Sequence, residues 1–494
     1  MEFLTQALDE KRPPAELIVL PFFGGSRRAE PATDLGLYKN SFNLPGVLED
    51  FHGNEGEQLF IYSSERKSDK RILLIGLGDR EKINTEKLRR NYALVTRICQ
   101  QKKIEKIDIV LPNHILNEES IVLGISEGLL LANYTFDQLK QAKKTKPNLL
   151  KTVNLVGVSK QGLAQANRCL TIAKGVYLAR DLVNGNADDV TPQHLSKIAQ
   201  DLAKKLPQTK VAVLDKKKLE KEKMGLILAV NRGSDKDPAL IILSYKGNPK
   251  SKDHTVLIGK GITYDTGGLN LKPVVSMETM KADMAGGAAV LGTLYAVASL
   301  RLKVNLTVMV PATENSIDAK SYKPGDVYKS YLGPTIEVNN PDAEGRLVLA
   351  DAIAYANQKL NPTRIIDIAT LTGGIDIALG AEACGLFSNH DVLADSLIRS
   401  GSKTYERVWR LPLYDEYRDH LKSDIADMKN SAGRSASSIT AAMFLQEFVG
   451  STPWAHLDIA STAYLSDKKR YHPKYATGFG VRLLVDLLSS ETEL

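Results

Sequence analysis

Two carboxylates and a guanidinium occur within five residues of one another in the segment Asn340–Leu347, which reads Asn-Pro-Asp-Ala-Glu-Gly-Arg-Leu. The apolar residues that follow recur at helical spacing, so Asp342 and Glu344 are predicted at or just before the N-terminus of a helix. Acids at this position stabilise a helix by ~0.3–1 kcal/mol through its macrodipole, and Asp is a good cap. The segment alone therefore fits either a helix start or a group of charged residues that does chemistry.

A second segment carries charged residues directly after a predicted strand. Thr255–Ile258 is apolar and β-branched, which predicts a buried strand that delivers Lys260 to its end. Asp265, Lys272 and Asp283 follow in a glycine-rich stretch. Loops at strand ends are where open α/β sheets bind ligands, and glycines let the backbone approach a ligand closely. Taken alone the two lysines would be ordinary surface residues, but their nearness to the acids favours a binding site.

Together the two segments supply four carboxylates, from Asp265, Asp283, Asp342 and Glu344. Carboxylates gathered in one pocket repel one another, so they either take up protons or recruit cations. Two divalent ions balance four negative charges, and ions ~3.5–4 Å apart are the arrangement with which two-metal hydrolases hold the attacking and leaving oxygens. The acids therefore predict a two-metal hydrolase.

The histidines give no support to a zinc protease of the helix-borne type, because they form neither a His-Glu-x-x-His pair nor a tight cluster. A site built from carboxylates does not need an imidazole. We expect each histidine to be a surface or core residue rather than a ligand; they are His52, His114, His194, His254, His390, His420, His456 and His472.

The chain resembles the leucyl aminopeptidases of the cytosol aminopeptidase family, bacterial type, whose signature is Asn-Thr-Asp-Ala-Glu-Gly-Arg-Leu. Other segments similar to that family occur in the family's order over roughly residues 175–494. They are Arg180–Asn184, Val256–Pro273, Met280–Met284, Pro311–Asn315, Thr370–Gly373, Ser423–Asp427 and His456–Ala460. So many separate matches make a chance resemblance very improbable.

One residue departs from the signature, because the family's threonine is Pro341 here. Proline lacks a backbone N–H and the threonine hydroxyl, and it pushes Asn340 toward extended conformations. All the carboxylates and the arginine are retained, so we expect metals to bind. A shift of Asp342, and with it a change of activity or metal preference, stays open.

The resemblance implies which residues would hold two divalent ions, Mn²⁺ or Zn²⁺. Asp265 and Glu344 would bridge both ions, Lys260 and Asp283 would complete one site, and Asp342 would complete the other. A metal binds only a neutral amine, so the pKa of Lys260 must fall from ~10.4, as it does when a lysine is desolvated beside a dication.

The resemblance also implies two catalytic residues. Lys272 would polarise the substrate carbonyl and stabilise the gem-diolate, and an ammonium group at a developing oxyanion does stabilise a transition state. Arg346 would hold a bicarbonate ion that serves as general base, and a planar guanidinium matches the planar oxygens of that ion.

The activity implied by the resemblance is the release of N-terminal amino acids from peptides. Met280, Thr370 and Gly373 would lie near the pocket for the first side chain. A flexible thioether suits several apolar side chains, so we expect Leu and Met at the substrate N-terminus; the alternative is that Met280 only packs in the core. The resemblance further implies a homohexamer of two trimers, with active sites that face an interior cavity.

The fold expected from the sequence is α/β, with two domains: a smaller N-terminal α/β domain of residues 1–160 and a larger catalytic domain of residues 181–494, joined by a helix in 161–180. Alternating strands and helices predict a mixed β-sheet sandwiched by helices in the catalytic domain. The predicted strands are Leu17–Leu20, Ile72–Leu77, Ile107–Leu111, Val153–Val156, Val211–Leu214, Ala239–Leu243, Thr255–Ile258, Val304–Val310, Ile365–Ala369 and Ala455–Ile459.

Composition agrees with an enzyme of ordinary globular character, since 494 residues with 43% hydrophobic and 25% charged content suffice for two domains. The longest apolar stretch, Gly286–Leu300, is too short to span a bilayer and predicts a buried helix. The N-terminus lacks a secretion signal, and the distant cysteines Cys99, Cys169 and Cys384 are expected to be reduced thiols. We therefore expect a cytoplasmic enzyme of peptide turnover that does not attach to membranes.

A serine hydrolase is the first alternative, because Gly124–Gly128 matches the Gly-x-Ser-x-Gly elbow around Ser126. That elbow needs a strand before it and a helix after it, whereas Glu119–Asn133 has helical apolar spacing straight through the serine. The context therefore argues against Ser126 as a nucleophile.

Nucleic-acid binding is the second alternative, because some members of the resembled family bind DNA and the net charge is +7. Residues 1–150 hold 22 Lys and Arg against 21 Asp and Glu, so the positive charge is not concentrated in an N-terminal DNA-binding domain. We expect nucleic-acid binding at most as a second activity.

Overall fold

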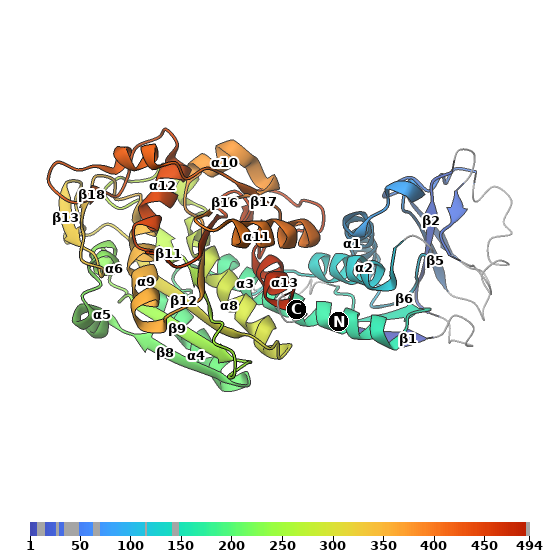
Figure 1. Cartoon of the computed structure of the whole chain (residues 1–494). Helices are drawn as coiled ribbons and strands as arrows, with labels where there is room; N and C mark the ends of the chain where they lie inside the picture. Colours follow the sequence, from blue (N-terminus) through green and yellow to red (C-terminus); the bar gives the residue numbers. More distant parts are fainter. Residues whose placement is uncertain are drawn as a thin grey trace. The chain divides into compact units, whose positions relative to one another are not determined.

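Apolar and β-branched runs form the strands of two separate sheets in the computed structural model (Figure 1). The structure describes residues 1–6, 15–25, 29–33, 49–62, 70–113, 116–140 and 148–490, and His114 lies outside them. The chain divides into one unit of Met1–Ala173 with Asp467–Pro473, and a second of Lys174–Ser466 with Lys474–Leu494. Both units combine a sheet with helices, which confirms the predicted α/β class with a smaller and a larger part.

The sheet of the first unit is mostly parallel. Strand β2 (Ile18–Phe23) is buried along its whole length, and β3 (Glu30–Pro31) pairs with it in antiparallel orientation. The strands of the main path, in spatial order, are β1 (Glu2–Gln6), β7 (Thr152–Val156), β6 (Lys106–Val110), β2, β5 (Arg71–Gly76) and the antiparallel β4 (Gln58–Tyr62). The four strands predicted for this region are confirmed.

Helix α2 (Glu118–Ala132) runs without interruption through the Gly-x-Ser-x-Gly pattern and packs on α1 (Thr85–Lys102). A Cβ atom at Gly124 would lie 2.7 Å from the carbonyl oxygen of Thr85, and one at Gly128 would lie 2.4 Å from that of Arg89. The two glycines therefore allow the helices to approach closely. Ser126 is fully buried inside this helix, so the pattern serves packing and the predicted helix is confirmed.

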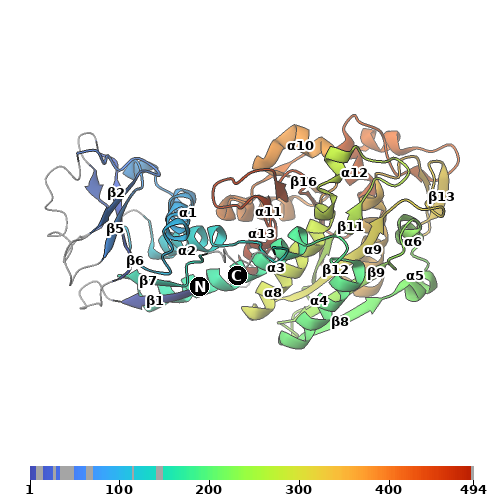
Figure 2. The same ribbon diagram turned by 180° about the vertical axis from the view of Figure 1, so that it is seen from behind.

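The sheet of the second unit is mixed, as predicted. The spatial order is β17 (Val408–Arg410), β16 (Cys384–Ser388), β19 (Trp454–Asp458), β15 (Arg364–Ala369), β10 (Thr255–Gly259), β12 (Asn305–Asn315), β9 (Ala239–Lys246) and β8 (Thr209–Leu214). Strands β19, β15, β10 and β12 are parallel to one another. β9 pairs in antiparallel orientation with both β12 and β8, and α4 (Pro192–Lys205) packs on β8 and β9 at this edge (Figure 2).

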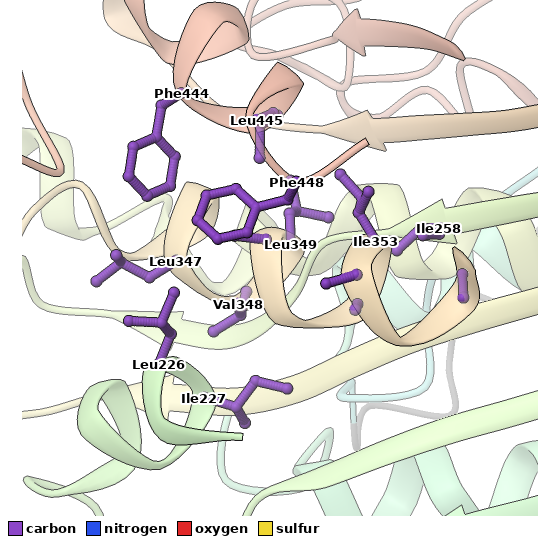
Figure 3. Packing of buried hydrophobic residues seen from close by; sticks show 14 of the residues in the cluster. Leu226, Ile227, Ile258, Leu347, Val348, Leu349, Ile353, Phe444, Leu445 and Phe448 are labelled. Atoms are coloured by element: carbon purple, nitrogen blue, oxygen red, sulfur yellow. The ribbon is translucent and has the colours of Figure 1, made fainter. Parts of the chain in front are cut away.

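Helices cover both faces of this sheet. Val256 and Ile258, which point to one face of β10, belong to the core cluster around α9 (Glu344–Leu360). Figure 3 shows residues of that cluster, with α9 between α6 (Gly225–Asn231) and the segment that includes α12 (Ser437–Gln446). The apolar α8 (Ala285–Ser299) also packs on β10, β12 and β15, as the buried helix predicted there. Among the described residues, no helix combines the length and the apolar character needed to cross a bilayer.

The burial of α9 is what fixes its N-terminus. Leu347, Val348 and Leu349 are all fully buried, so the helix contacts core residues on several sides within its first two turns. A small sheet leads into this turn, with β14 (Thr335–Val338) between β13 (Asp326–Lys329) and β18 (Met428–Lys429). The segment from β14 to α9 is therefore held at both ends.

Candidate metal centre

Charged side chains from three separate segments converge at the ends of the central strands. Lys260 lies between β10 and β11 (Gly261–Asp265), and Asp265 is the last residue of β11. Asp283 lies in the 3-10 helix η4 (Met280–Met284), directly before α8. Glu344 is the first residue of α9. The arrangement is the one expected at the carboxyl ends of parallel strands in an α/β sheet.

Lys260 connects two of the acids. Its Nζ lies 2.8 Å from the carboxylate of Asp283 and 2.8 Å from Oε1 of Glu344. Nζ also donates to the carbonyl oxygen of Thr370 at 2.9 Å, and the Thr370 hydroxyl donates to Asp283 Oδ1 at 2.7 Å. Thr370, at the end of β15, therefore holds both members of the Lys260–Asp283 pair.

Lys272 connects the other two acids. Its Nζ lies 2.9 Å from Oδ2 of Asp265 and 2.5 Å from Oδ1 of Asp342. The second oxygen of Asp265 accepts hydrogen bonds from Asn315 Nδ2 and from the backbone N–H of Gly267, both at 2.8 Å. The structure thus brings together the four carboxylates and both lysines named from the sequence.

Arg346 lies one half-turn into α9 and is 5% exposed. Its Nη1 donates to the carbonyl oxygen of Asn430 at 2.9 Å, whereas Nε makes no hydrogen bond with any described residue. Burial lowers the pKa of the guanidinium to about 10 against the opposing effect of Glu344 and Asp458, so Arg346 remains a cation at neutral pH.

The residues expected around the substrate side chain border the same region. Met280 is half-buried and begins η4, three residues before Asp283. Gly373 is exposed and begins α10 (Gly373–Leu379), and a Cβ atom there would meet no atom within 4 Å. Open space therefore lies beside the backbone of Gly373.

Burial and mutual repulsion shift the pKa values of the acids. Burial raises the pKa of Asp265 and of Asp283, and it raises the pKa of Asp342 to about 7, with the charges of neighbouring carboxylates adding to the effect. Burial also pushes the pKa of Glu344 upward, but Lys260 and Lys272 outweigh it and hold that pKa below its ordinary value. The site therefore needs nearby positive charge to keep all four acids ionised.

The pKa values of Lys260 and Lys272 are set by neighbouring charges more than by burial. Burial lowers the pKa of each ammonium, but the carboxylates around it outweigh that effect and raise both pKa values above their ordinary range. For Lys260 this is the reverse of the direction expected for a metal-binding amine. The physical reason is that its ammonium is itself a counter-ion of Asp283 and Glu344, a role that a divalent cation would have to take over.

The donor set fits divalent cations. One oxygen each of Asp265, Asp342 and Glu344 lie within 4.8 Å of one another, and carboxylate oxygens suit hard divalent ions. Oε2 of Glu344 is buried and accepts no hydrogen bond from the described residues. A buried anionic oxygen without a partner is costly, and a cation at this position would remove that cost.

Neutral residues outside the predicted ligands and catalytic residues hold the acidic turn. The carbonyl oxygen of Pro341 accepts hydrogen bonds from the Tyr322 hydroxyl at 2.6 Å and from Asn315 Nδ2 at 3.1 Å. Oδ1 of Asn340 accepts the backbone N–H of Asp342 at 2.9 Å. Pro341 thus contributes its carbonyl group to the turn.

Gly345 is the position at which a small substitution is expected to disturb Lys260. A Cβ atom there would lie 2.6 Å from Lys260 Cε and 2.7 Å from Nζ, and Lys260 is only 2% exposed. Because the family resemblance implies Lys260 as a metal ligand, we expect Gly345→Ala to lower Mn²⁺ affinity and kcat/KM by about 10–100-fold, the usual effect of disturbing the support of such a ligand. Titration with Mn²⁺ and steady-state kinetics measure both quantities.

The melting temperature is the control for Gly345→Ala. Alanine favours a helix over glycine by about 1 kcal/mol, so α9 itself should not be weakened. Unchanged Mn²⁺ affinity and kcat/KM in a folded variant would show that Lys260 can move aside freely.

Family models match both parts of the chain. Residues 177–485 match the model described as "Cytosol aminopeptidase family, catalytic domain". Residues 47–143 match "Cytosol aminopeptidase family, N-terminal domain". The first match spans all the acids and lysines of the site.

Curated relatives match over nearly the whole length. A "Probable cytosol aminopeptidase" of Protochlamydia amoebophila is 56% identical over 492 residues, which cover 99% of this chain and 98% of the relative. A protein of the same description from Chlamydia abortus is 48% identical over 492 residues, with 98% of both chains covered.

A solved structure is similar as well. The "Bottromycin maturation enzyme BotP" has a TM-score of 0.85 and 29% sequence identity, with 97% of this chain and 100% of that chain covered. A structure of BotP in complex with Mn matches to the same extent.

Proposed function

The chain belongs to the cytosol aminopeptidase family and is a metal-dependent aminopeptidase, and from this premise we propose that it uses two divalent ions to release N-terminal Leu, Met and other apolar residues from peptides. The observation that carries the proposal is the convergence of four carboxylates on the buried Lys260 and the partly buried Lys272 at the strand ends. When bound, the ions supply Lewis-acid activation of water and of the scissile carbonyl.

We assign five residues to the ions. Lys260 and Asp283 would hold one ion, Asp342 would hold the other, and Asp265 and Glu344 would contact both. The mutual proximity of Asp265, Asp342 and Glu344 supports the assignment, as does the pairing of Lys260 with Asp283. The BotP complex supports Mn²⁺ as the first ion to test, with Zn²⁺ as the second.

Two cationic residues would act on the substrate and the base. Lys272 would place its ammonium beside the oxygen that becomes negative as the carbonyl is attacked, where a fixed positive charge stabilises the transition state. Arg346 would bind a bicarbonate ion, the general base, through its guanidinium. The bond from Nη1 to the Asn430 carbonyl orients this guanidinium, and the remaining N–H groups can face an anion.

The substrate side chain would lie against Met280, Thr370 and Gly373. The open space beside Gly373 and the half-buried thioether of Met280 support this choice. An unbranched thioether adapts to side chains of different shape, which suits a preference for Leu and Met over one strict specificity.

We also propose a homohexamer, which only the family resemblance supports, and a place in cytoplasmic peptide turnover. The proposed division into an N-terminal domain of residues 1–160, a linking helix of 161–180 and a catalytic domain of 181–494 rests on the sequence pattern, and helix α3 (Lys160–Asn184) runs through the linking segment. DNA binding is proposed only as a second activity, which steeply salt-dependent duplex binding would reveal.

The test is hydrolysis of a leucine chromogenic amide by protein stripped with a chelator, before and after Mn²⁺ or Zn²⁺ is restored. We expect release to stop without metal and to return with it. Activity that survives the chelator but is lost to a serine-directed covalent inhibitor would instead support the buried Ser126 as nucleophile. Metal-loaded protein that is inert on leucine and on other N-terminal residues would contradict the aminopeptidase proposal.

A further inference from the structure

A row of polar contacts runs from β14 to the turn that carries Asp342. β14 and β18 pair in parallel, with Ile336 opposite Met428 and Glu337 opposite Lys429. The backbone N–H of Asn430 then donates to the carbonyl oxygen of Glu337 at 2.9 Å. Beyond this bond, side chains continue the pairing in place of the main chain.

Two asparagines make these contacts reciprocally. Asn339 Nδ2 donates to the carbonyl oxygen of Ser431 at 2.9 Å, and its Oδ1 accepts the N–H of Ser431 at 3.1 Å. Asn430 Nδ2 donates to the carbonyl oxygen of Asn340 at 2.7 Å, and its Oδ1 accepts the N–H of Asn340 at 3.2 Å. Each side-chain amide thus pairs with both polar groups of one residue on the opposite segment, as a peptide group would in a strand.

Asn430 makes more contacts with the acidic turn than Asn339 does. It is fully buried, and its Nδ2 also contacts the carbonyl oxygen of Ala343 at 3.3 Å. Its own carbonyl oxygen accepts the bond from Arg346 Nη1 at 2.9 Å. Asn430, a single neutral residue, therefore binds both ends of the turn that contains Asp342, at Asn340 and Ala343. It also binds one nitrogen of the Arg346 guanidinium.

We propose that Asn430 is a positioning residue that holds the Asp342–Glu344 turn and Arg346 in a single arrangement. The inference rests on the proposed function, because it concerns the same acids and the same arginine. Loss of the Asn430 amide removes the partner of backbone groups of the half-buried Asn340 and the buried Ala343, which would let the turn relax. Outer partners of metal ligands typically change metal affinity or activity by about 10–100-fold.

The chain offers a matched control for Asn430→Ala. Asn305 also pairs its amide with both polar groups of one loop residue, Asn248, at 3.2 Å to the N–H and 2.8 Å to the carbonyl oxygen. Its Nδ2 also donates to the carbonyl oxygens of Ser251 and Asp253, both at 3.1 Å. Asn305 begins β12, and Asn315 ends it, about 33 Å away along the strand.

The experiment compares the metal-stripped wild type, Asn430→Ala and Asn305→Ala. Mn²⁺ alone is titrated in, free Mn²⁺ is followed by electron paramagnetic resonance, and melting temperatures and kinetics on a leucine amide are recorded. For Asn430→Ala we expect Mn²⁺ affinity to fall about 10–100-fold, with kcat reduced more than KM is changed. Asn305→Ala should melt at a lower temperature than the wild type, yet keep its Mn²⁺ affinity and its kcat within about twofold of the wild-type values.

Asn339→Ala provides a second variant if Asn430→Ala fails to fold. Asn339 is exposed and lies on the other half of the reciprocal pair, so its loss should give a smaller decrease of the same kind. The inference would be overturned if Asn430→Ala kept its Mn²⁺ affinity and kinetics to the same extent as Asn305→Ala. If Asn430→Ala cannot be folded, wild-type Mn²⁺ affinity and kinetics in Asn339→Ala would overturn it. A wild type that is inert on every amide would instead contradict the proposed function, while the Mn²⁺ titrations would still test the positioning role.

Discussion

Glu344→Gln is expected to abolish aminopeptidase activity, with kcat/KM reduced by about 10³-fold or more. Glu344 is 1% exposed, Oε1 pairs with Lys260 Nζ at 2.8 Å, and Oε2 accepts no hydrogen bond from the described residues. Glutamine keeps the shape but removes the charge. One of its two terminal atoms also becomes an N–H₂ donor aimed into a group of oxygens and an ammonium. The variant should therefore lose both a proposed metal ligand and the electrostatic balance of the site.

Mn²⁺-dependent stabilisation separates this loss from misfolding. A ligand at 100 times its Kd stabilises a folded protein by about 2.7 kcal/mol, so wild-type protein should melt at a higher temperature when Mn²⁺ is added. We expect Glu344→Gln to melt near the metal-free wild type and to gain little on Mn²⁺ addition. A normal gain together with normal turnover would contradict the role of Glu344.

Glu406→Gln is the matched control for this substitution. Glu406 is 2% exposed and pairs with Arg482 at 3.3 Å, and Oε2 accepts the backbone N–H groups of Gly480 and Leu483. The same chemical change at this buried acid should lower the melting temperature. The additional rise produced by Mn²⁺ should survive, because Glu406 is not among the assigned ligands.

The strands that the sequence predicts are those whose apolar character is continuous. β10 is an uninterrupted apolar run, and β15 is interrupted only by Asp367; both are buried along nearly their whole length, as parallel strands rich in β-branched residues are. β1, with the sequence Glu-Phe-Leu-Thr-Gln, is an edge strand with polar residues and lacks that signal. β16 contains a glycine and a serine within five residues, which weakens the pattern although the strand is fully buried.

One predicted strand is longer in the structure than its apolar pattern. Val304–Val310 was expected, but β12 continues through Pro311 to Asn315. β12 pairs with β10 up to Met309 and with β11 from Ala312 onward, so Pro311 falls between these two stretches. A missing N–H at that position removes no ladder bond to β10 or β11, while on the other side of β12 Pro311 lies opposite Leu240 of β9.

The charged part of the candidate site could be selected from the sequence, and its neutral support could not. Four acids and two lysines are unusual near strand ends, and electrostatics predicts what they do when gathered together. Asn315 lies in a segment that resembles the family but gives no sign of its role, and Asn430 lies outside every such segment, 84 residues beyond the arginine that it contacts. Only the fold brings such residues to the turn.

Lys272→Met is expected to separate metal binding from catalysis. The ammonium of Lys272 pairs with Asp265 at 2.9 Å and with Asp342 at 2.5 Å, so in stripped protein it competes with a cation for the same carboxylates. Methionine has a similar length without the charge. We therefore expect Mn²⁺ affinity to be unchanged or higher, because a competing charge is gone. We expect kcat to fall by about 10²–10³-fold, because the developing oxyanion loses the ammonium proposed to stabilise it.

Lys403→Met controls for the loss of an ion-paired lysine. Lys403 lies on α11 (Asp391–Thr404) and pairs with Asp486 at 2.9 Å. Its side chain is more exposed than that of Lys272, so Lys403→Met should change neither Mn²⁺ affinity nor kcat by much. Mn²⁺ titration and single-turnover kinetics on a leucine amide distinguish the outcomes for Lys272→Met. If affinity and turnover fall together, Lys272 acts mainly by holding the two acids in place. If turnover alone falls, the positive charge acts on the reacting carbonyl, and the ammonium leaves the acids when the ions bind.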